Sequence, residues 1–279
     1  MIPRFRKIAS GLVATLAVCL VSSRCAATVQ TAFDNLDCGR PEGAQVERVE
    51  REGYALGFSD KYKQSLWVQY RLTKDEVLTR KASRLLGFMP DPAVRNSAVP
   101  EDYRTPKGDE LNKQGDGAYD RGHLAPASDM HWSEKVMTES FYMSNVSPQL
   151  PSFNRGIWKS LEQTVRRFAY SEDFVWVVTG PVFGKNWDGK TIGDNKVAVP
   201  WGFYKAVYSE KDGGKMIGFV LKHAPGDKDN LKKLACSVAD VEKATGLVFF
   251  GKAPAQLKKS FDPAAWQWTE DRRKARQGK

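Results

Sequence analysis

The chain has 279 residues, of which 41% are hydrophobic and 27% are charged, a composition typical of soluble globular proteins. Its formal net charge of +10 favours a polyanionic partner, such as nucleic acid, an anionic membrane or an acidic polysaccharide, without choosing among them. Because there are only three histidines and no CxxC motif, HExxH metalloproteases, most multi-histidine metal sites and cysteine zinc fingers are excluded.

The N-terminal segment has the layout of a secretory signal peptide. Basic residues precede an apolar run over residues 8–21, and small residues just before position 28 offer a cleavage site. We therefore expect a signal peptide over residues 1–27, one mature domain over residues 28–279, and a secreted or periplasmic protein without stable membrane association. The alternative is an uncleaved membrane anchor. Arg24 beside the cleavage site leaves it open, although the run is shorter than the about 20 apolar residues of a transmembrane helix.

Cleavage at this point would change both the charge and the cysteine content. It would remove four basic residues and no acidic ones, which lowers the net charge from +10 to +6. Two cysteines, Cys38 and Cys236, would remain. One disulfide between them suits an oxidising compartment, but the sequence does not reveal whether they lie close enough in space to form it.

The first third of the mature chain contains two strand-like segments. Residues 53–58 and 66–72 alternate between apolar and polar side chains, with a polar turn at residues 59–61, so we expect an antiparallel pair. Residues 83–119 show little periodicity and are rich in Pro, Gly, Asp and Asn. They predict a long loop, and long loops inside compact domains often carry function.

The rest of the chain is denser in regular patterns. Large apolar side chains recur at helical spacing between Trp158 and Phe168 and predict a helix over residues 152–170. Further elements are expected as strands over residues 174–179, 197–207, 215–221 and 247–250, and as a helix over residues 237–245 that ends at Gly246. The expected fold class is therefore α+β, one domain with a mixed, mainly antiparallel sheet and flanking helices.

His123 differs from the other two histidines in its neighbours. A lone histidine is more often structural than catalytic, and we assign a structural role to His131 and His223. Ahead of His123, Arg121 supplies a cation, and Gly122 allows an unusual backbone conformation or a close approach to a partner. In a basic protein this order suits a phosphodiester, because arginine can hold an oxygen while histidine handles a proton.

A second polar cluster begins at Ser144-Asn145 and continues through Asn154, Glu162 and Arg166. On an ideal helix Glu162 and Arg166 lie about 80° and 120° around from Asn154, and Glu162 lies about 12 Å along the axis. Asn154 and Glu162 can hardly bind one ion directly, but a cation that keeps its waters, such as Mg²⁺, can join them through water. Taken alone, the pattern favours a helix cap at Asn154 and an i,i+4 ion pair between Glu162 and Arg166.

Three motifs follow one another in order along this part of the chain. They are Asp120-Arg121-Gly122-His123-Leu124-Ala125-Pro126, then Ser144-Asn145 with Pro148-Gln149, and then Asn154 with Trp158 and Leu161-Glu162. Together they closely resemble the DNA/RNA non-specific endonuclease family of ββα-metal, or His-Me finger, nucleases. The resemblance extends over nearly all of the mature chain, including residues 67–70, 178–181 and 241–247.

The resemblance implies roles for the histidine and for the residues around the metal. His123 corresponds to the general base, Asn154 to the direct protein ligand of Mg²⁺, and Glu162 to a residue that holds magnesium-bound water. Asn145 corresponds to a residue that helps to position the histidine and the phosphate. These assignments imply a ββα-metal motif within the α+β fold.

The resemblance also implies a set of arginines. Arg121 and Arg166 correspond to arginines that contact the phosphate and stabilise the transition state. Arg84 is the match to a further upstream arginine, but the spacing after it is longer than the expected pattern. Arg80 and Arg95 therefore remain alternatives at that position.

The activity that follows is the Mg²⁺-dependent hydrolysis of DNA and RNA with little sequence preference and with 5′-phosphate products. Mn²⁺ is expected to substitute for Mg²⁺, and a protein inhibitor and a homodimer are compatible with the family. Because the base must be a neutral imidazole, activity is expected to fall as the pH drops through about 6 to 7. Contacts mainly to phosphate predict strong inhibition by salt.

One competing interpretation is nucleotide hydrolysis at a P-loop. Residues 184–191 satisfy the GxxxxGK[ST] pattern, but a P-loop needs a helix directly after the Lys-Thr pair, whereas residues 192–195 and then a strand follow. We expect a hairpin loop there.

A non-catalytic protein that binds nucleic acid or another polyanion also fits the composition. His123 together with Asn154 favours the enzyme, because binding alone requires neither.

Overall fold

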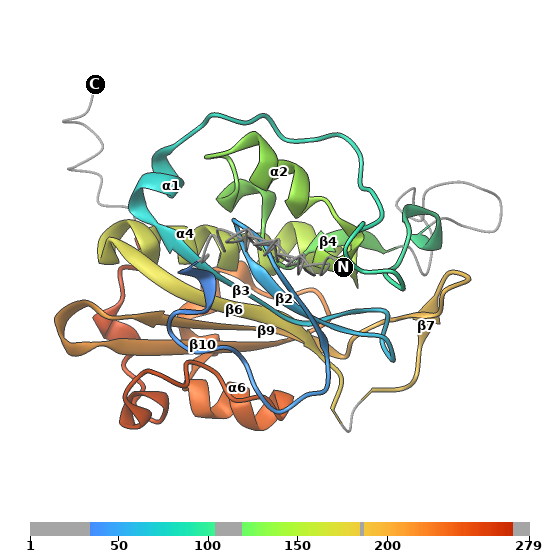
Figure 1. Ribbon diagram of the computed structural model, residues 1–279. Helices are drawn as coiled ribbons and strands as arrows, with labels where there is room; N and C mark the ends of the chain where they lie inside the picture. The colour runs from blue at the N-terminus through green and yellow to red at the C-terminus, as the bar shows by residue number, and fades with distance from the viewer. Residues whose placement is uncertain (1–33, 104–118, 185–186, 270–279) are drawn as a thin grey trace, which may run out of the picture. The chain divides into compact units, whose positions relative to one another are not determined.

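A seven-stranded antiparallel sheet forms the centre of the structure (Figure 1), a computed structural model that describes residues 34–103, 119–184 and 187–269. The described residues belong to one unit, residues 33–279. The sheet contains, in spatial order, β1 (Glu47–Glu50), β2 (Ala55–Ser59), β3 (Gln64–Thr73), β6 (Phe174–Val182), β9 (Gly202–Ser209), β10 (Lys215–Lys222) and β11 (Ala235–Cys236). Two separate ribbons pair β4 (Asp120–His123) with β5 (Val146–Gln149), and β7 (Thr191–Ile192) with β8 (Val197–Ala198).

Helices cover both faces of the sheet. In Figure 1, α2 and α4 lie on one side of it together with the β4–β5 ribbon, and α6 lies on the other. The helices are α1 (Lys74–Leu78), α2 (Glu134–Ser140), α3 (Pro151–Phe153), α4 (Lys159–Glu172), α5 (Leu231–Leu234) and α6 (Val238–Thr245). Short 3-10 helices lie at Asp34–Leu36, Pro100–Tyr103, Ala127–Asp129, Met143–Asn145, Lys211–Gly213, Lys228–Asn230, Ala255–Lys258 and Pro263–Ala265.

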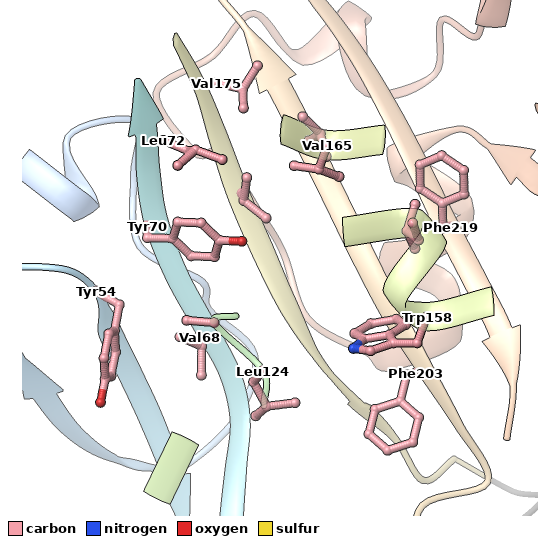
Figure 2. Packing of buried hydrophobic residues seen from close by; sticks show 14 of the residues in the cluster. Tyr54, Val68, Tyr70, Leu72, Leu124, Trp158, Val165, Val175, Phe203 and Phe219 are labelled. Atoms are coloured by element: carbon pink, nitrogen blue, oxygen red, sulfur yellow. The ribbon is translucent and has the colours of Figure 1, made fainter. Parts of the chain in front are cut away.

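Two hydrophobic clusters hold these layers together, one on each face. The larger cluster packs the apolar stripe of α4 and the residue before it onto the sheet, and Figure 2 shows Trp158 beside Phe203, whose ring centroids are 5.6 Å apart. The second cluster packs α6, through Val238 and Val241, against the opposite face. Full burial of each large side chain contributes roughly 1.5–3 kcal/mol, so α4 is fixed firmly in place.

The predicted fold class and most predicted elements are confirmed. Residues of β2 and β3 form the expected antiparallel pair, and a helical segment does occupy residues 151–172. The α6 helix begins after a capping box in which Ser237 accepts from the amide of Asp240, and it ends at Gly246 in the left-handed conformation, with φ 73°. That backbone conformation is accessible to glycine without a steric penalty, which explains why the helix stops there.

Two predicted strands were wrong. The run 197–207 is divided between β8 and β9, because Pro200 lacks the N–H that a continuous strand needs in its ladder. Residues 247–250 form no strand, and only Val248 makes an isolated bridge, to Glu42. Phe250 has a φ of 51°, which breaks an extended backbone, and this run is apolar because it fills the core beneath α6.

The loops behave largely as expected where they are described. Lys190-Thr191 lead into the β7–β8 hairpin rather than into a helix, which rules out a P-loop there. Residues 83–103 contain a single 3-10 helix, and residues 104–118 of the predicted long loop lie outside the described residues, as does the predicted signal peptide. Within the described ranges, no helix has the length and apolar character needed to cross a membrane.

The two cysteines of the described chain are both free thiols, so the candidate disulfide is not formed. Cys38 is buried beside Gln69, whose amide nitrogen lies 3.4 Å from the sulfur. Cys236 lies in β11 at the far edge of the sheet. Burial raises the pKa of Cys236 to about 11, so its thiol stays protonated and unreactive at neutral pH.

Candidate functional site

The DRGH motif forms β4, and the chain around Pro148 forms its partner β5. The two strands pair from Asp120 with Gln149 to His123 with Val146. A side chain at Gly122 would collide with the buried side chain of Gln149, which is the local reason for glycine in the motif. The hydroxyl of Ser147 donates to Gln64 of β3 over 2.6 Å, so the ribbon is tied to the central sheet.

His123 is buried with one ring nitrogen unpartnered. Its ring packs against those of Phe88 and Phe141, with centroids 5.0 and 4.8 Å away, and its Nε2 has no hydrogen-bond partner among the described residues. Burial, reinforced by the positive charge of Arg84, lowers the pKa of His123 from 6.5 to about 3. This shift favours the neutral imidazole, which can accept a proton, and it moves the expected acidic loss of activity to lower pH; the loss itself stays a prediction.

Asn145 holds the backbone directly after His123. Its side-chain oxygen accepts from the amide of Ala125 over 2.9 Å, and its amide nitrogen donates to the carbonyls of Ala125 and Ser140. The Asn145 carbonyl also accepts from the amide of Leu124. Because the side chain is fully buried and all of these bonds are made, the end of β4 has one defined position.

The helix that carries Asn154 starts with a widened turn. Asn154–Trp158 is π-helical, and Gly156 has non-helical torsions of φ −99° and ψ −113°. One extra residue in a turn removes about 100° of rotation, so Glu162 and Arg166 lie within roughly 20° of the Asn154 direction instead of about 80° and 120° away. The widened turn thus places the three side chains on one face, which a regular helix does not.

Asp120 fixes the orientation of Asn154. The buried carboxylate of Asp120 accepts from the amide nitrogen of Asn154 over 2.8 Å and from Arg155 over 2.9 and 2.6 Å. Because the nitrogen is held by a carboxylate, the side-chain oxygen of Asn154 is the end left to accept a cation or a donor. Asp120 therefore links the histidine strand to the start of the helix.

A buried charge network supports the other end of the site. The carboxylate of Asp129 accepts from Arg166 over 2.7 Å and from the Tyr70 hydroxyl over 2.9 Å. Burial raises the pKa of Glu162, although the positive charges of Lys205, Arg166 and Arg84 oppose that effect. Glu162 itself is only half-buried, and its carboxylate makes no hydrogen bond to another of the described residues, so it is available to a ligand.

Lys205 is the cation behind this network. It is fully buried in β9, donates to Thr179 over 3.0 Å and to the carbonyl of Leu124 over 3.5 Å, and lies 4.5 Å from the ring centroid of Trp158. Burial lowers the pKa of Lys205, and the charge of Glu162 opposes the shift. One ammonium group thus contacts the residue after His123 and the end of the widened turn.

Two predicted arginines flank the histidine pocket. The guanidinium of Arg84 lies 5.2 Å from the Phe141 ring centroid, and that of Arg121 lies 5.2 Å from Phe88. The charge of Arg84 lowers the pKa of both His123 and Glu162, so it acts on both halves of the site. Arg80, just after α1, instead donates to the carbonyls of Val77 and Thr79 at the end of that helix, which favours Arg84 at this position.

The other histidines have structural partners. His223 accepts from the amide of Leu150 over 2.7 Å and its other nitrogen lies 3.0 Å from the carbonyl of Pro200, while His131 lies 2.7 Å from the carbonyl of Ala82. Sequence reasoning missed Asp120, Asp129 and Lys205. Only the position of Asp120 inside the motif signalled its importance, because the partners of a buried charge come from distant parts of the chain.

The residues of the site fit a hard cation that keeps most of its water. No group of three or more His, Cys, Asp or Glu side chains suited to a metal occurs among the described residues. The oxygen of Asn154, which Asp120 leaves exposed to a ligand, and the carboxylate of Glu162 are oxygen donors of the kind that Mg²⁺ prefers. Such a donor set would hold the ion through one amide oxygen and through water.

Comparisons with known proteins agree with this arrangement. The sequence model of the DNA/RNA non-specific endonuclease family matches residues 33–256. The chain is 35% identical to human mitochondrial endonuclease G over 224 residues, which cover 76% of this chain and 71% of that protein. It is 33% identical to mitochondrial nuclease 1 of Schizosaccharomyces pombe over 238 residues, which cover 79% and 71%.

A solved structure is similar as well. In the crystal structure of an EndoG/EndoGI complex, a chain that is 28% identical superposes with a TM-score of 0.69, covering 80% of this chain and 93% of that one. The expected secreted or periplasmic location is wrong, because endonuclease G and nuclease 1, the two relatives described above, are named as mitochondrial. A basic start followed by an apolar run does not by itself separate a secretory signal from other targeting segments.

Proposed function

The chain belongs to the DNA/RNA non-specific endonuclease family, and on that basis we propose that this nuclease hydrolyses internal phosphodiester bonds of DNA and RNA. In this proposal Asn154 binds Mg²⁺, and His123 is the general base. The observation that carries the proposal is the unpartnered, neutral Nε2 of buried His123, three residues from the aspartate that orients Asn154. A protein that only binds nucleic acid has no need of either.

The residues around the phosphate have different roles in proton transfer, charge stabilisation and positioning. Nε2 of His123 accepts a proton from the attacking water, because a neutral imidazole is a competent base and no protein group occupies that nitrogen. Arg84, Arg121 and Arg166 hold the non-bridging oxygens, on which charge builds in the transition state. Asn145 keeps His123 in place through the backbone of Ala125.

The metal would be held by the remaining residues. Asn154 would supply its amide oxygen, Asp120 would keep that oxygen turned outward, and Glu162 would accept hydrogen bonds from the water shell. When bound, Mg²⁺ supplies positive charge that stabilises the leaving 3′ oxygen and the phosphoryl group, and Mn²⁺ would substitute for it. Dependence on a divalent metal follows from membership of the family, and the choice of Mg²⁺, with Mn²⁺ as its substitute, is the specific part of this proposal.

Partners and location belong to the same proposal. The named EndoG/EndoGI complex supports a protein inhibitor for this chain too, and the names of the relatives support a mitochondrial location. The first 33 residues hold four basic and no acidic side chains, a balance that is also typical of mitochondrial transit peptides. A homodimer stays a prediction.

End-group analysis after metal titration tests the proposal. Cleavage of plasmid DNA should appear on addition of Mg²⁺ or Mn²⁺, stop with EDTA, and leave 3′-hydroxyl ends that terminal transferase extends without phosphatase treatment. Asn154→Ala should need much more metal, while the exposed Lys243→Ala on α6 should match the parent. Full cleavage in EDTA, or ends that carry a 3′-phosphate, would contradict the proposed chemistry.

A further inference from the structure

A pocket of about 830 Å³ lies between α1 and the second half of α4. Arg166 is one of its lining residues, and the same guanidinium is paired with Asp129 beside Glu162. In Figure 1, α1 lies close above the end of α4 that is remote from β4. The pocket therefore shares Arg166 with the proposed active site and extends along the second half of the helix that carries it.

The lining of this α1–α4 pocket is strongly basic. Among its lining residues Asp173 is the single acidic one, and it pairs with Lys211 over 3.1 Å. The basic residues of the lining are Lys74, Arg80, Arg166, Arg167 and Lys211. Because one carboxylate faces five cations, the pocket has an excess of positive charge that attracts a polyanion.

Three of these cations lack an acidic partner among the described residues. Arg80 donates to the carbonyls of Val77 and Thr79, and Arg167 donates to Thr164 and to the carbonyl of Trp268. Each guanidinium has five N–H donors, so donors remain for a ligand. The ammonium of Lys74 lies 4.9 Å from the ring centroid of Tyr170 and keeps its own donors as well.

The distance to the proposed site matches a nucleic-acid strand. Glu162 and Tyr170 are eight residues apart, which is about 12 Å along α4. Nucleotides repeat about every 3.4 Å along a duplex, so the pocket lies roughly three to four nucleotides from the cleaved bond. Tyr170, whose ring carries the Lys74 ammonium, is 39% exposed at the pocket wall, so this cation lies at an accessible position.

We propose that the α1–α4 pocket binds the phosphate backbone of one nucleic-acid strand on one side of the cleaved bond, through Lys74, Arg80 and Arg167. The proposal rests on the proposed nuclease function, because its register is counted from that site. It adds a second binding region that has no part in the proton transfer and that sets how much strand the enzyme must engage.

Salt-dependent binding tests this pocket directly. Full-length His123→Ala protein, with and without Lys74→Gln/Arg80→Gln, is titrated with a fluorescent 20-nucleotide single strand at several salt concentrations. Each lost phosphate contact should lower the slope of log K against log salt by about 0.7, and the double variant should lose roughly tenfold in affinity near 0.15 M salt. Arg80→Gln alone should lose about half of the slope change, and it guards against misfolding because Arg80 is exposed.

A charge-matched control and the parent enzyme separate the outcomes. Lys243→Gln/Lys252→Gln removes two exposed cations elsewhere and should leave the slope unchanged. The proposal that the pocket binds the strand would be overturned by equal slopes of log K against log salt in the pocket variant and its His123→Ala parent. It would also be overturned by an equal change of slope in the Lys243→Gln/Lys252→Gln control. If the protein with His123 cleaves DNA while the slopes stay equal, only the pocket fails. If it cleaves nothing, the proposed function fails, while a pocket-dependent slope still supports strand binding.

Discussion

The Asp120→Asn substitution tests whether Asp120 orients Asn154, the proposed metal ligand, because it changes the hydrogen bonds at Asp120 without changing the size of the side chain. The variant keeps the size of the side chain but replaces one acceptor oxygen by an NH₂ group, which cannot accept from Asn154 or Arg155. Where the new NH₂ group takes the place of the oxygen that faces Asn154, the amide of Asn154 gains by turning its oxygen towards that donor and its nitrogen towards the metal. A nitrogen that carries two hydrogens is not a ligand for Mg²⁺.

The magnitude follows from the bonds that are lost. Asp120 accepts one hydrogen bond from Asn154 and two from Arg155, and the two from Arg155 matter least because the Arg155 side chain is 62% exposed. A hydrogen bond to a charged group contributes roughly 1.5–3 kcal/mol. If that amount is lost from Asn154, Mg²⁺ affinity falls about 10- to 100-fold, since about 1.4 kcal/mol is tenfold.

The assay is a Mg²⁺ titration of plasmid cleavage with thermal melting alongside. Asp120→Asn should shift the half-maximal Mg²⁺ concentration upward by about 10- to 100-fold. Arg155→Met, which removes the exposed partner of the same carboxylate, should shift it by no more than about threefold. A wild-type Mg²⁺ dependence in a folded Asp120→Asn protein would refute the reasoning, and an equal shift in both variants would assign the effect to Arg155.

Three further outcomes follow from the buried groups. The folded pKa of His123, about 3, lies below the unfolded value of 6.5, so the contribution of this residue to stability is present above pH 6.5 and is lost as the pH falls towards 3. The melting temperature of His123→Asn should therefore fall less between pH 7 and pH 5 than that of the parent protein. An equal fall in both proteins would contradict a buried, neutral His123 ring. Gly122→Ala should lower the free energy of unfolding by about 1–3 kcal/mol in denaturant titrations because its new methyl group meets Gln149, and an unchanged midpoint would count against the β4–β5 packing. Lys205→Met removes a positive charge that lowers the pKa of Glu162, so the acidic limb of the profile of kcat/KM against pH should move to higher pH. Lys205→Arg should partly restore the parent profile. A Lys205→Met profile that superimposes on that of the parent would show that Lys205 does not act on Glu162.

Periodicity predicted the elements that build the scaffold because they obey simple patterns. The paired strands β2 and β3 alternate, and the stripe from Trp158 to Phe168 has helical spacing, so both could be placed before the fold was known. Residues 247–250 were misassigned because a short apolar run indicates burial but not the kind of element that is buried.

The site was harder to predict where it depends on irregular backbone and on distant partners. Ideal-helix geometry separated Asn154 from Glu162, and only the π-helical turn with its kink at Gly156 brings them onto one face. The lowered pKa of His123 could not be foreseen, because the phenylalanines that bury its ring, Phe88 and Phe141, lie 35 and 18 positions away in the sequence. Neither effect leaves a pattern in the local sequence.

Cleavage by His123→Ala beside the parent tests the central claim most directly. Supercoiled plasmid DNA and single-stranded RNA are incubated with each protein in Mg²⁺ and, separately, in EDTA. The parent should degrade both nucleic acids in Mg²⁺ alone, and the variant should be slower by about 10²- to 10⁴-fold, the usual contribution of a general base. Intact DNA and RNA after incubation with the parent, or parent-like rates in the variant, would contradict it.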